Sequence, residues 1–163
     1  MDLTSDFADS VPDPALTHQW LVRFPNSTNA YSSIPEEMNV SFTKIPAKPR
    51  HNAGTNTYFP DFSDISAISV TFYETKDFDC TKWIRDWRKK IVNHSDGVYG
   101  VSDEYKVDAT LELYSIDSET PVLTITLKGV WPTEQNDWQL SYDDAEGRIK
   151  CIVPFSVDDA EIE

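Results

Sequence analysis

Two stretches of alternating apolar and polar residues constrain the fold of this chain more than any other feature. Residues 106–114 and 122–130 each place an apolar side chain at every second position, which is the period of a β-strand with one face on a core. Only a short connection at Asp117-Ser118 separates them, so we expect the two strands to pair as an antiparallel hairpin. The polar positions of this hairpin include Asp108, Thr110, Glu112, Thr124 and Thr126, together with Lys128.

Further strands are predicted on both sides of this hairpin. Residues 148–157 alternate, with Ile149, Cys151, Val153, Phe155 and Val157 on one face. Shorter or less regular strands are expected at residues 18–24, 38–44, 66–73 and 138–142. An acidic turn at 143–147 and an acidic tail at the C-terminus complete this half of the chain.

One helix is predicted, at about residues 78–93. Its apolar residues recur at three- and four-residue steps and form a single stripe: Cys80, Trp83, Ile84, Trp87 and Ile91. Asp77 or Asp79 is expected to cap the helix. Basic residues gather on the other side and toward the C-terminal end, where they suit the helix dipole.

Residues 45–64 are predicted to form a long loop. Pro46, Pro49, Pro60 and Gly54 interrupt any long element, yet the segment also carries aromatic side chains. Two interpretations stay open: the loop covers a surface of a partner, or it folds back on its own core. The residues expected to contact a neighbouring subunit are Arg50, Asn52, Thr55, Tyr58, Phe59 and Phe62.

These elements indicate a mainly β protein with one α-helix, built as an antiparallel β-sandwich or barrel. A length of 163 residues suits one domain, expected at 17–163, after a flexible acidic N-terminal arm at 1–16. Short connections favour antiparallel pairing, and one-sided alternation leaves a second, polar face on the sheet.

The charge balance argues against a nucleic-acid-binding or membrane-binding surface. The chain carries 28 acidic and 14 basic Lys and Arg residues, a net charge of −14 at pH 7, whereas binding to duplex DNA and to anionic lipids relies on cationic contacts. The chain shows no signal peptide and no apolar stretch long enough for a membrane span.

No motif for catalysis, metal binding or cofactor binding stands out. The three histidines, His18, His51 and His94, lack metal-ligand spacing, and phosphate-binding and nucleophile motifs are missing. Cys80 and Cys151 are expected to be free thiols, and they can pair only if the fold brings them together. We therefore expect no enzyme activity, no cofactor and no small-molecule substrate.

Two rival functions remain at this point. The first is a monomeric carbohydrate-binding module, in which Trp131 and Trp138 would stack on sugars. The second is a hydrolase with an acid pair that no motif identifies.

The C-terminal half resembles the tail tube proteins of contractile-tailed bacteriophages. The similarity lies in LTITLKGVWPT (Leu123–Thr133) and WQLSYDDAEGRIKCIVPFSVDD (Trp138–Asp159). Upstream, Val70-Thr71-Phe72 leads into a helix with Trp87, and a glycine-bearing loop leads to Tyr105-Lys106. The resemblance spans about residues 38–159. SVTFYE and FSVDD are at least as close to the baseplate proteins of the same fold that initiate the tube.

The resemblance implies a structural virion protein. In such a protein, subunits close into hexameric β-barrel rings that stack inside a sheath, and DNA passes through the lumen without specific binding. The polar residues of the predicted hairpin would then line the lumen, and Lys128 would lie near a subunit junction. The implied partners are further copies of the chain, the tail sheath and the baseplate, and the implied location is the phage tail, assembled in the bacterial cytoplasm. A tube-initiator ring of the baseplate is the alternative within the same family.

Overall fold

The computed structural model describes residues 19–27, 35–42, 44–61, 65, 67–116, 118–134, 138, 140 and 147–163. The predicted N-terminal arm, Phe62 and the acidic turn up to residue 146 lie outside these ranges. Of the predicted strand 138–142, only residues 138 and 140 are described, and neither is in a strand.

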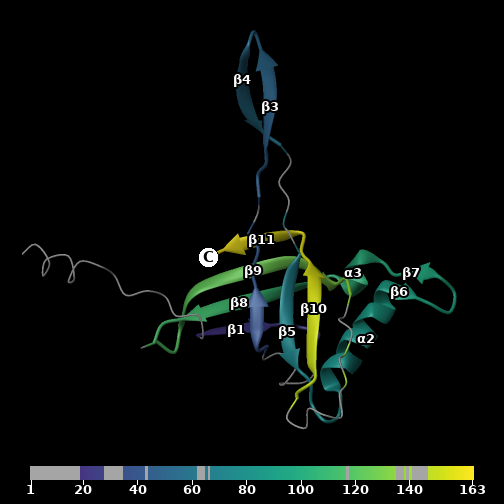
Figure 1. Cartoon of the computed structure of the whole chain (residues 1–163). Coiled ribbons are helices and arrows are strands. Elements are labelled where there is room, and N and C mark those ends of the chain that lie inside the picture. Colours follow the sequence, from purple (N-terminus) through teal and green to yellow (C-terminus); the bar gives the residue numbers. More distant parts are fainter. Residues whose placement is uncertain are drawn as a thin grey trace, which may run out of the picture.

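Four antiparallel strands form the first layer of the body (Figure 1). They are β1 (Trp20–Arg23), β8 (Val107–Tyr114), β9 (Pro121–Pro132) and β11 (Asp159–Ile162), in the spatial order β1-β8-β9-β11. The pairing of β8 with β9 confirms the hairpin predicted from alternation. The acidic tail also forms a strand, which was not predicted: β11 pairs with the middle of β9 and brings Ala160 opposite Leu127.

The second layer crosses the first and shares one of its strands. It contains β2 (Glu37–Asn39), β5 (Ile68–Tyr73) and β10 (Lys150–Ser156), and β10 also pairs with the end of β9 through Phe155 opposite Pro132. Strand β9 can serve both layers because its ladder is irregular at Gly129, which adopts a φ of +64°. A Cβ at Gly129 would lie 2.2 Å from a carboxylate oxygen of Asp158, so a larger residue there would displace this side chain and would also carry the strain of the positive φ. Within the described residues the sheet stays open, so a single copy is not a closed barrel.

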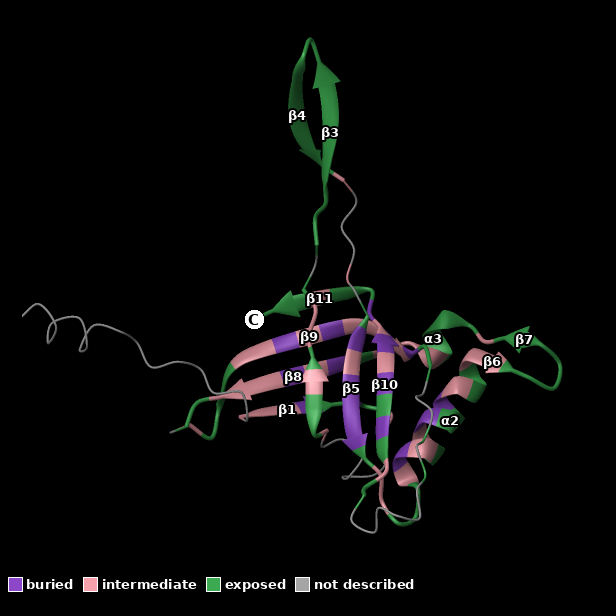
Figure 2. Ribbon diagram, viewed as in Figure 1, coloured by how far each residue is buried: buried purple, intermediate pink, exposed green. Residues whose placement is uncertain are grey.

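The core lies between the two layers and under the helix (Figure 2). Aromatic rings dominate its centre: Phe24 stacks on Phe155 with ring centroids 5.2 Å apart, and Phe72 meets Trp83 edge to face at 5.7 Å. The predicted inward residues of β8, β9 and β10 are buried or half-buried, as the alternation indicated.

Helix α2 (Asp79–Ile91) closes the side of the sandwich and confirms the predicted helix. Cys80, Ile84 and Trp87 are buried, and the Trp87 indole Nε1 donates a hydrogen bond of 2.6 Å to the carbonyl oxygen of Tyr105. The predicted cap is wrong: the residue before the helix is Phe78, which makes no side-chain cap. The carboxylate of Glu74 instead accepts hydrogen bonds from the backbone N–H groups of Cys80 and Thr81.

The prediction of one helix also needs correction. After α2 the chain forms a small antiparallel ribbon of two strands, each two residues long: β6 (Val92–Asn93) and β7 (Val98–Tyr99). A short helix, α3 (Ser102–Tyr105), follows. A single turn has too few residues to show the periodicity of a helix in sequence. In the described part of the chain, no helix is long and apolar enough to cross a membrane.

The predicted long loop at 45–64 is instead a β-hairpin that projects away from the body (Figure 1). Strands β3 (Ala47–Asn52) and β4 (Thr55–Pro60) pair in full register, and every residue of both strands is exposed. Ala53 and Gly54 form the turn with φ values of 45° and 87°, the two positive values of a tight hairpin turn. Pro49 and Pro60 are tolerated because a two-stranded ribbon consists only of edge strands.

Candidate assembly surfaces

The polar face of the four-stranded layer brings together all five residues predicted to line a lumen. Thr110 lies opposite Thr126, and Glu112 lies opposite Thr124, so these four side chains share one face of β8 and β9. They are half-buried, whereas Asp108 at the start of β8 is exposed. The Asp108 carboxylate also accepts a hydrogen bond of 3.0 Å from the backbone N–H of Gly129 and so holds the irregular part of the ladder.

Glu112 is the centre of a polar cluster on this face. The Tyr114 hydroxyl donates a hydrogen bond of 2.7 Å to its carboxylate, and Arg23 Nε lies 3.3 Å from the same oxygen. The bond from Tyr114, with a further contribution from Arg23, holds the pKa of Glu112 below its usual value. The carboxylate therefore stays ionised at neutral pH, and Arg23 offsets its charge.

Cations on the polar face contact carboxylates of their own chain. Lys128 forms an ion pair with Glu161 at 2.5 Å, and this contact raises the pKa of the lysine. This carboxylate lies in the same copy as Lys128, on the edge strand β11. The face also contains Asp159, which lies opposite Lys128. With Arg23, Asp108 and Glu112 included, these positions carry four carboxylates and two cations, a net of −4 + 2 = −2.

Each edge of the four-stranded layer presents backbone groups outward. In an antiparallel ladder, amides alternate between the neighbouring strand and the opposite side. In β11, Glu163 exchanges two backbone hydrogen bonds with Thr124, so its N–H points toward β9. The N–H of the preceding residue, Ile162, therefore points away from β9. In β1, the carbonyl of Gln19 points toward β8, where it accepts a hydrogen bond from the N–H of Tyr114. By the same alternation, the N–H groups of Trp20 and Val22 point away from β8. Exposed strand edges of this kind are templates for pairing with another chain.

The projecting hairpin carries five of the six residues predicted to contact a neighbour. Because directly opposed residues share a face, one face holds Arg50 opposite Thr57 and Asn52 opposite Thr55. Lys48 and Phe59 extend this face toward the base, and Tyr58 lies on the other face, opposite Pro49. Tyr58 and Phe59 are 64% and 48% exposed, so the hairpin does not fold back on the core of its own chain.

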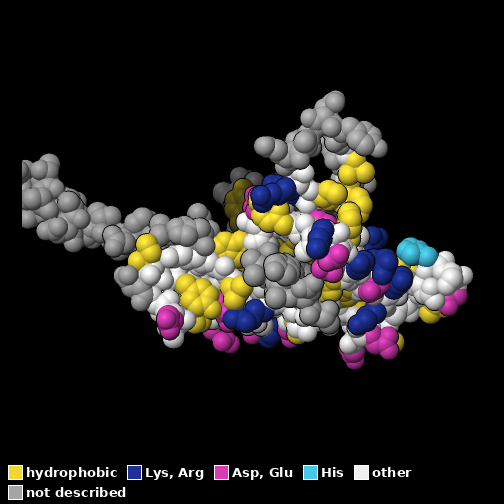
Figure 3. Space-filling view, turned by 90° about the horizontal axis from the view of Figure 1, so that it is seen from below, with side chains coloured by type: hydrophobic (Ala, Val, Ile, Leu, Met, Phe, Trp, Pro, Cys, Tyr) yellow, Lys and Arg dark blue, Asp and Glu magenta, His cyan; other side chains and the backbone are white. Residues whose placement is uncertain are grey.

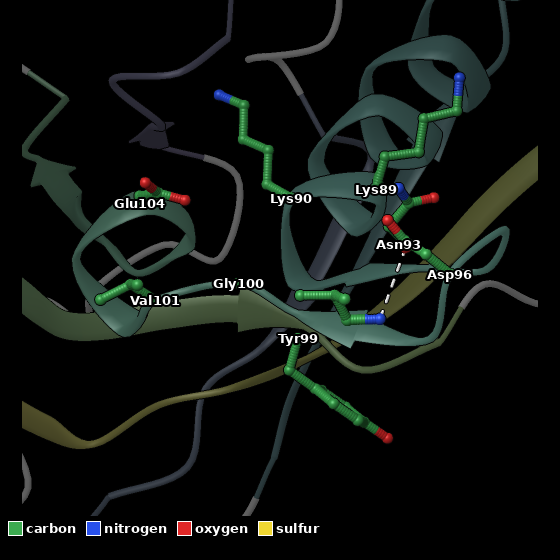
Figure 4. Close-up of a pocket in the computed structure, with 9 residues that line it drawn as sticks. Lys89, Lys90, Asn93, Asp96, Tyr99, Gly100, Val101 and Glu104 are labelled. Atoms are coloured by element: carbon green, nitrogen blue, oxygen red, sulfur yellow. Dashed lines mark hydrogen bonds between the residues drawn. The ribbon is translucent and has the colours of Figure 1, made fainter.

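A hollow of about 650 Å³ lies at the C-terminal end of α2 and was not predicted (Figure 4). Lys89, Lys90 and Asn93 border it on one side, and Tyr99 and Glu104 on the other. Gly100 shapes it, because a Cβ there would lie 1.9 Å from the carbonyl oxygen of Lys90. These residues lie on four separate elements, α2, β6, β7 and α3, so no periodic pattern in the sequence identifies the hollow.

Cys80 and Cys151 lie side by side in the core. Their sulfur atoms and a carboxylate oxygen of Glu74 are within 4.8 Å of one another, and both cysteines are free thiols. The contact with Cys151, together with burial, raises the pKa of Cys80, so this thiol stays protonated. Each oxygen of Glu74 already accepts two hydrogen bonds at the start of α2, which gives this carboxylate a structural role rather than a metal-binding one.

The two tryptophans considered for sugar binding contact aromatic residues of their own chain. Trp131 meets Tyr105 edge to face, with ring centroids 6.0 Å apart. Trp138 packs at 5.4 Å against Phe78, at the start of α2. Each ring is thus engaged at a separate place, and the pair forms no common platform for a glycan.

Comparison with known proteins agrees with this architecture. The chain is 26% identical over 113 residues to the tail tube protein gp19 of Enterobacteria phage T6. That match covers 69% of this chain and 63% of the relative, so somewhat less than two thirds of the relative's length is matched. No protein-family model matches the chain.

Solved structures extend the similarity to the whole fold. The anti-feeding prophage cap, a tube-terminating cap, superposes with a TM-score of 0.73 at 13% identity, covering 100% of this chain and 99% of the other. This likeness shows that the chain has the same fold as that cap. A chain of the six-fold symmetrised baseplate of the anti-feeding prophage superposes with a TM-score of 0.66 at 14% identity, covering 94% and 97%. These two structures and this chain therefore share one overall fold.

Proposed function

We propose that this chain is the structural subunit of the inner tube of a contractile phage tail and closes into hexameric rings that pass DNA. The single observation that carries the proposal is the four-stranded layer, which has a polar face and two open edges in a chain of tail tube type. Relatives and structural neighbours with structural roles support a non-enzymatic function.

The number and direction of the strands favour ring closure. The order β1-β8-β9-β11 alternates in direction, so β11 runs antiparallel to β1. A rotation axis that places β11 of one copy beside β1 of the next would therefore continue the antiparallel pattern. Six copies would contribute 6 × 4 = 24 strands, and barrels of this size leave an open channel, unlike small barrels whose interior is filled by side chains.

The chemistry of the polar face suits a channel for DNA. Each copy would present threonines and a small excess of carboxylates, and its cations Arg23 and Lys128 already contact Glu112 and Glu161. Contacts of lysine and arginine with phosphate release counterions and bind DNA, so their neutralisation by carboxylates keeps a duplex from adhering. We assign five residues to the wall: Asp108, Thr110, Glu112, Thr124 and Thr126.

A tube-terminating or tube-initiating ring of the same fold is the second candidate. The tube-terminating cap of the anti-feeding prophage gives the higher TM-score of the two structures described, and the baseplate chain follows closely. A terminal ring would close laterally like a tube ring but would accept further rings on one side only. In both cases the partners would be the sheath and the baseplate, and the protein would be assembled in the bacterial cytoplasm and reside in the tail.

Lateral closure can be tested at the outer edge of β11. Ile162→Pro removes the N–H that points away from β9, and the matched control Ile162→Val keeps it. We expect wild type and Ile162→Val to form rings in negative-stain microscopy and mass photometry. Ile162→Pro should remain a monomer with an unchanged circular dichroism spectrum.

Two results would contradict the proposal. If Ile162→Pro formed normal rings, the outer edge of β11 would not be the edge that pairs with the next copy. A wild-type protein that stays monomeric at all concentrations, and binds glycans, would support the carbohydrate-binding alternative instead.

A further inference from the structure

Cys80 and Cys151 are the two cysteines of the chain, and they meet in the core although 151 − 80 = 71 positions separate them in the sequence. Cys80 lies in the first turn of α2, and Cys151 lies near the beginning of β10. Their sulfur atoms are within 4.8 Å of each other, and the two side chains are 2% and 0% exposed. The pair therefore sits at the contact between the helix and the second layer.

The position of the pair suits a covalent link as well as core packing. A single buried cysteine fills a core as a small apolar side chain does, and alanine or valine would serve equally well there. Two thiols side by side have a further property, because a disulfide forms when their sulfur atoms approach to about 2.05 Å. Rotation of the two side chains and a small shift of the first turn of α2 supply this approach, since the ends of a helix open more easily than its middle.

The surroundings of the two thiols protect them from most oxidants. The contact with Cys151, burial and the nearby carboxylate of Glu74 all raise the pKa of Cys80, and the thiolate is the form that attacks an oxidant. A small neutral oxidant is favoured over a large anionic disulfide, because the thiols lie in the core of a chain with a net charge of −14 at pH 7. On the side seen from below, acidic and basic side chains lie intermingled rather than in one cationic patch that would attract an anionic reagent (Figure 3).

We propose that Cys80 and Cys151 are a latent cross-link, which hydrogen peroxide converts into a disulfide that staples α2 to β10. Hydrogen peroxide first oxidises one thiol to a sulfenic acid: an S–O bond forms, the O–O bond breaks and one water leaves. The sulfur of the second thiol then attacks the sulfenic sulfur: the S–S bond forms, the S–O bond breaks and a second water leaves. Together the two thiols lose two electrons and two protons, and the peroxide is reduced to two water molecules.

The cross-link forms within one copy and does not require rings. Its timing alone rests on the proposed function: a tail subunit made in a reducing cytoplasm would keep both thiols until the particle is released into an oxidising medium. A disulfide across 71 positions then restricts the unfolded chain and so favours the folded one.

Peptide mapping of the full chain tests whether the link forms. The folded protein is treated with hydrogen peroxide, the remaining thiols are blocked under denaturing conditions, and a digest is examined by mass spectrometry without reducing agent. We expect one linked pair of peptides that contains Cys80 and Cys151, an intact mass lower by two hydrogen atoms, and loss of the link on reduction. Cys151→Ala should give no link, and Cys80→Ala is the second variant if the first folds poorly.

Urea denaturation tests whether the link acts as a staple. Oxidised wild type should unfold at a urea midpoint about 1–2 M higher than the reduced protein, the shift expected of a disulfide that closes a long loop. Reduction should abolish this shift. The midpoint of Cys151→Ala should be the same with and without peroxide.

The route of the oxidant to the thiols is tested at the start of α2. Glu74→Ala removes the carboxylate that holds the first turn, so peroxide should link the pair about ten times faster than in wild type. Asp77→Ala is the matched control and should link at the wild-type rate. Oxidised glutathione at the same concentration should link the folded wild type far more slowly than peroxide does.

Several results would overturn the inference. One is recovery of both cysteines as free thiols or as separate sulfinic acids, and another is a link between copies instead of within one. A bridge without a higher urea midpoint would show that the link is not a staple. Equal linking rates for Glu74→Ala and wild type, or faster linking by oxidised glutathione, would contradict the protected pair. None of these results bears on ring formation, which electron microscopy of the same samples measures separately.

Discussion

At the scale of single residues, Glu74 and Trp87 show how side chains join the helix to the sheets. Glu74 follows β5, and its carboxylate accepts the backbone N–H groups of Cys80 and Thr81 at the start of α2. A carboxylate at a helix N-terminus satisfies unpaired donors and also suits the positive end of the helix dipole. Trp87 anchors the other end through its bond to the carbonyl of Tyr105.

Replacing Glu74 should therefore weaken the start of α2. We expect Glu74→Ala to lower the free energy of unfolding by about 1–2 kcal/mol, the usual effect of losing a helix cap. Asp77→Ala is the control, because the structure gives that exposed side chain no role in the cap, and it should stay within about 0.5 kcal/mol of wild type. Urea denaturation measures both values. An equal effect of the two substitutions would show that Glu74 is not the cap.

Trp87→Ala should cost about 3–5 kcal/mol of unfolding free energy, the range for a buried large aromatic side chain. Trp87 is 2% exposed and packs against Phe24 and Phe155. Tyr99→Ala, at a side chain that is 77% exposed, should leave the denaturation midpoint unchanged. A midpoint unaffected by Trp87→Ala would mean that this stripe does not hold the helix on the core.

At the scale of elements, predictability depends on whether an element faces the core. The strands β8, β9 and β10 and the helix α2 each place one apolar face on the core, so their periodicity is visible in the sequence. The hairpin β3–β4 has no buried face, and its register comes from the turn at Ala53-Gly54 and from backbone pairing. For β11 the surrounding acidic residues hide the one side chain, Ala160, that packs on the core. The five residues predicted to line a lumen can be recognised as polar-face positions because they alternate with core positions. Arg23 and Glu161, opposite Thr110 and Thr126, come from strands that only the tertiary fold brings close.

Because both strands of the hairpin are exposed along their whole length, shortening it should leave the body folded. Replacing residues 50–57 by Asn-Gly retains the pairs at the base and supplies a tight turn. We expect a near-native circular dichroism spectrum, an unfolding free energy within about 1 kcal/mol of wild type, and loss of stacked tubes in electron microscopy. If the shortened protein unfolds, the hairpin belongs to the folding unit after all.

At the scale of the whole molecule, two surfaces are available for assembly: the polar face of the four-stranded layer and the projecting hairpin. The polar face of β1, β8, β9 and β11 turns away from the core, and the hairpin projects beyond the body (Figure 1). In the proposed ring of six, the formal charge would be 6 × −14 = −84 before counterions are counted. Such an assembly would repel DNA at its wall, and a confined channel focuses that field.

Adding cations to the polar face should therefore impede DNA. Thr124→Lys with Thr126→Lys introduces two positive charges per copy and leaves the Arg23–Glu112 pair in place. We expect tubes to assemble, because both side chains lie on the polar face, but DNA release from particles carrying the variant should slow and become dependent on salt. Thr124→Gln with Thr126→Gln is the uncharged control. Normal release from the lysine variant would mean that these positions do not meet DNA.

The central claim is that this chain closes into rings with the polar face of its four-stranded layer on the inside. Electron cryomicroscopy of the assemblies formed by the purified protein tests it most directly. The account predicts six-fold rings in which β11 of one copy pairs with β1 of the next, with Thr110, Glu112 and Thr126 lining the channel. A density map with these three side chains on the outer wall, or particles that remain single copies at every concentration tested, would contradict it.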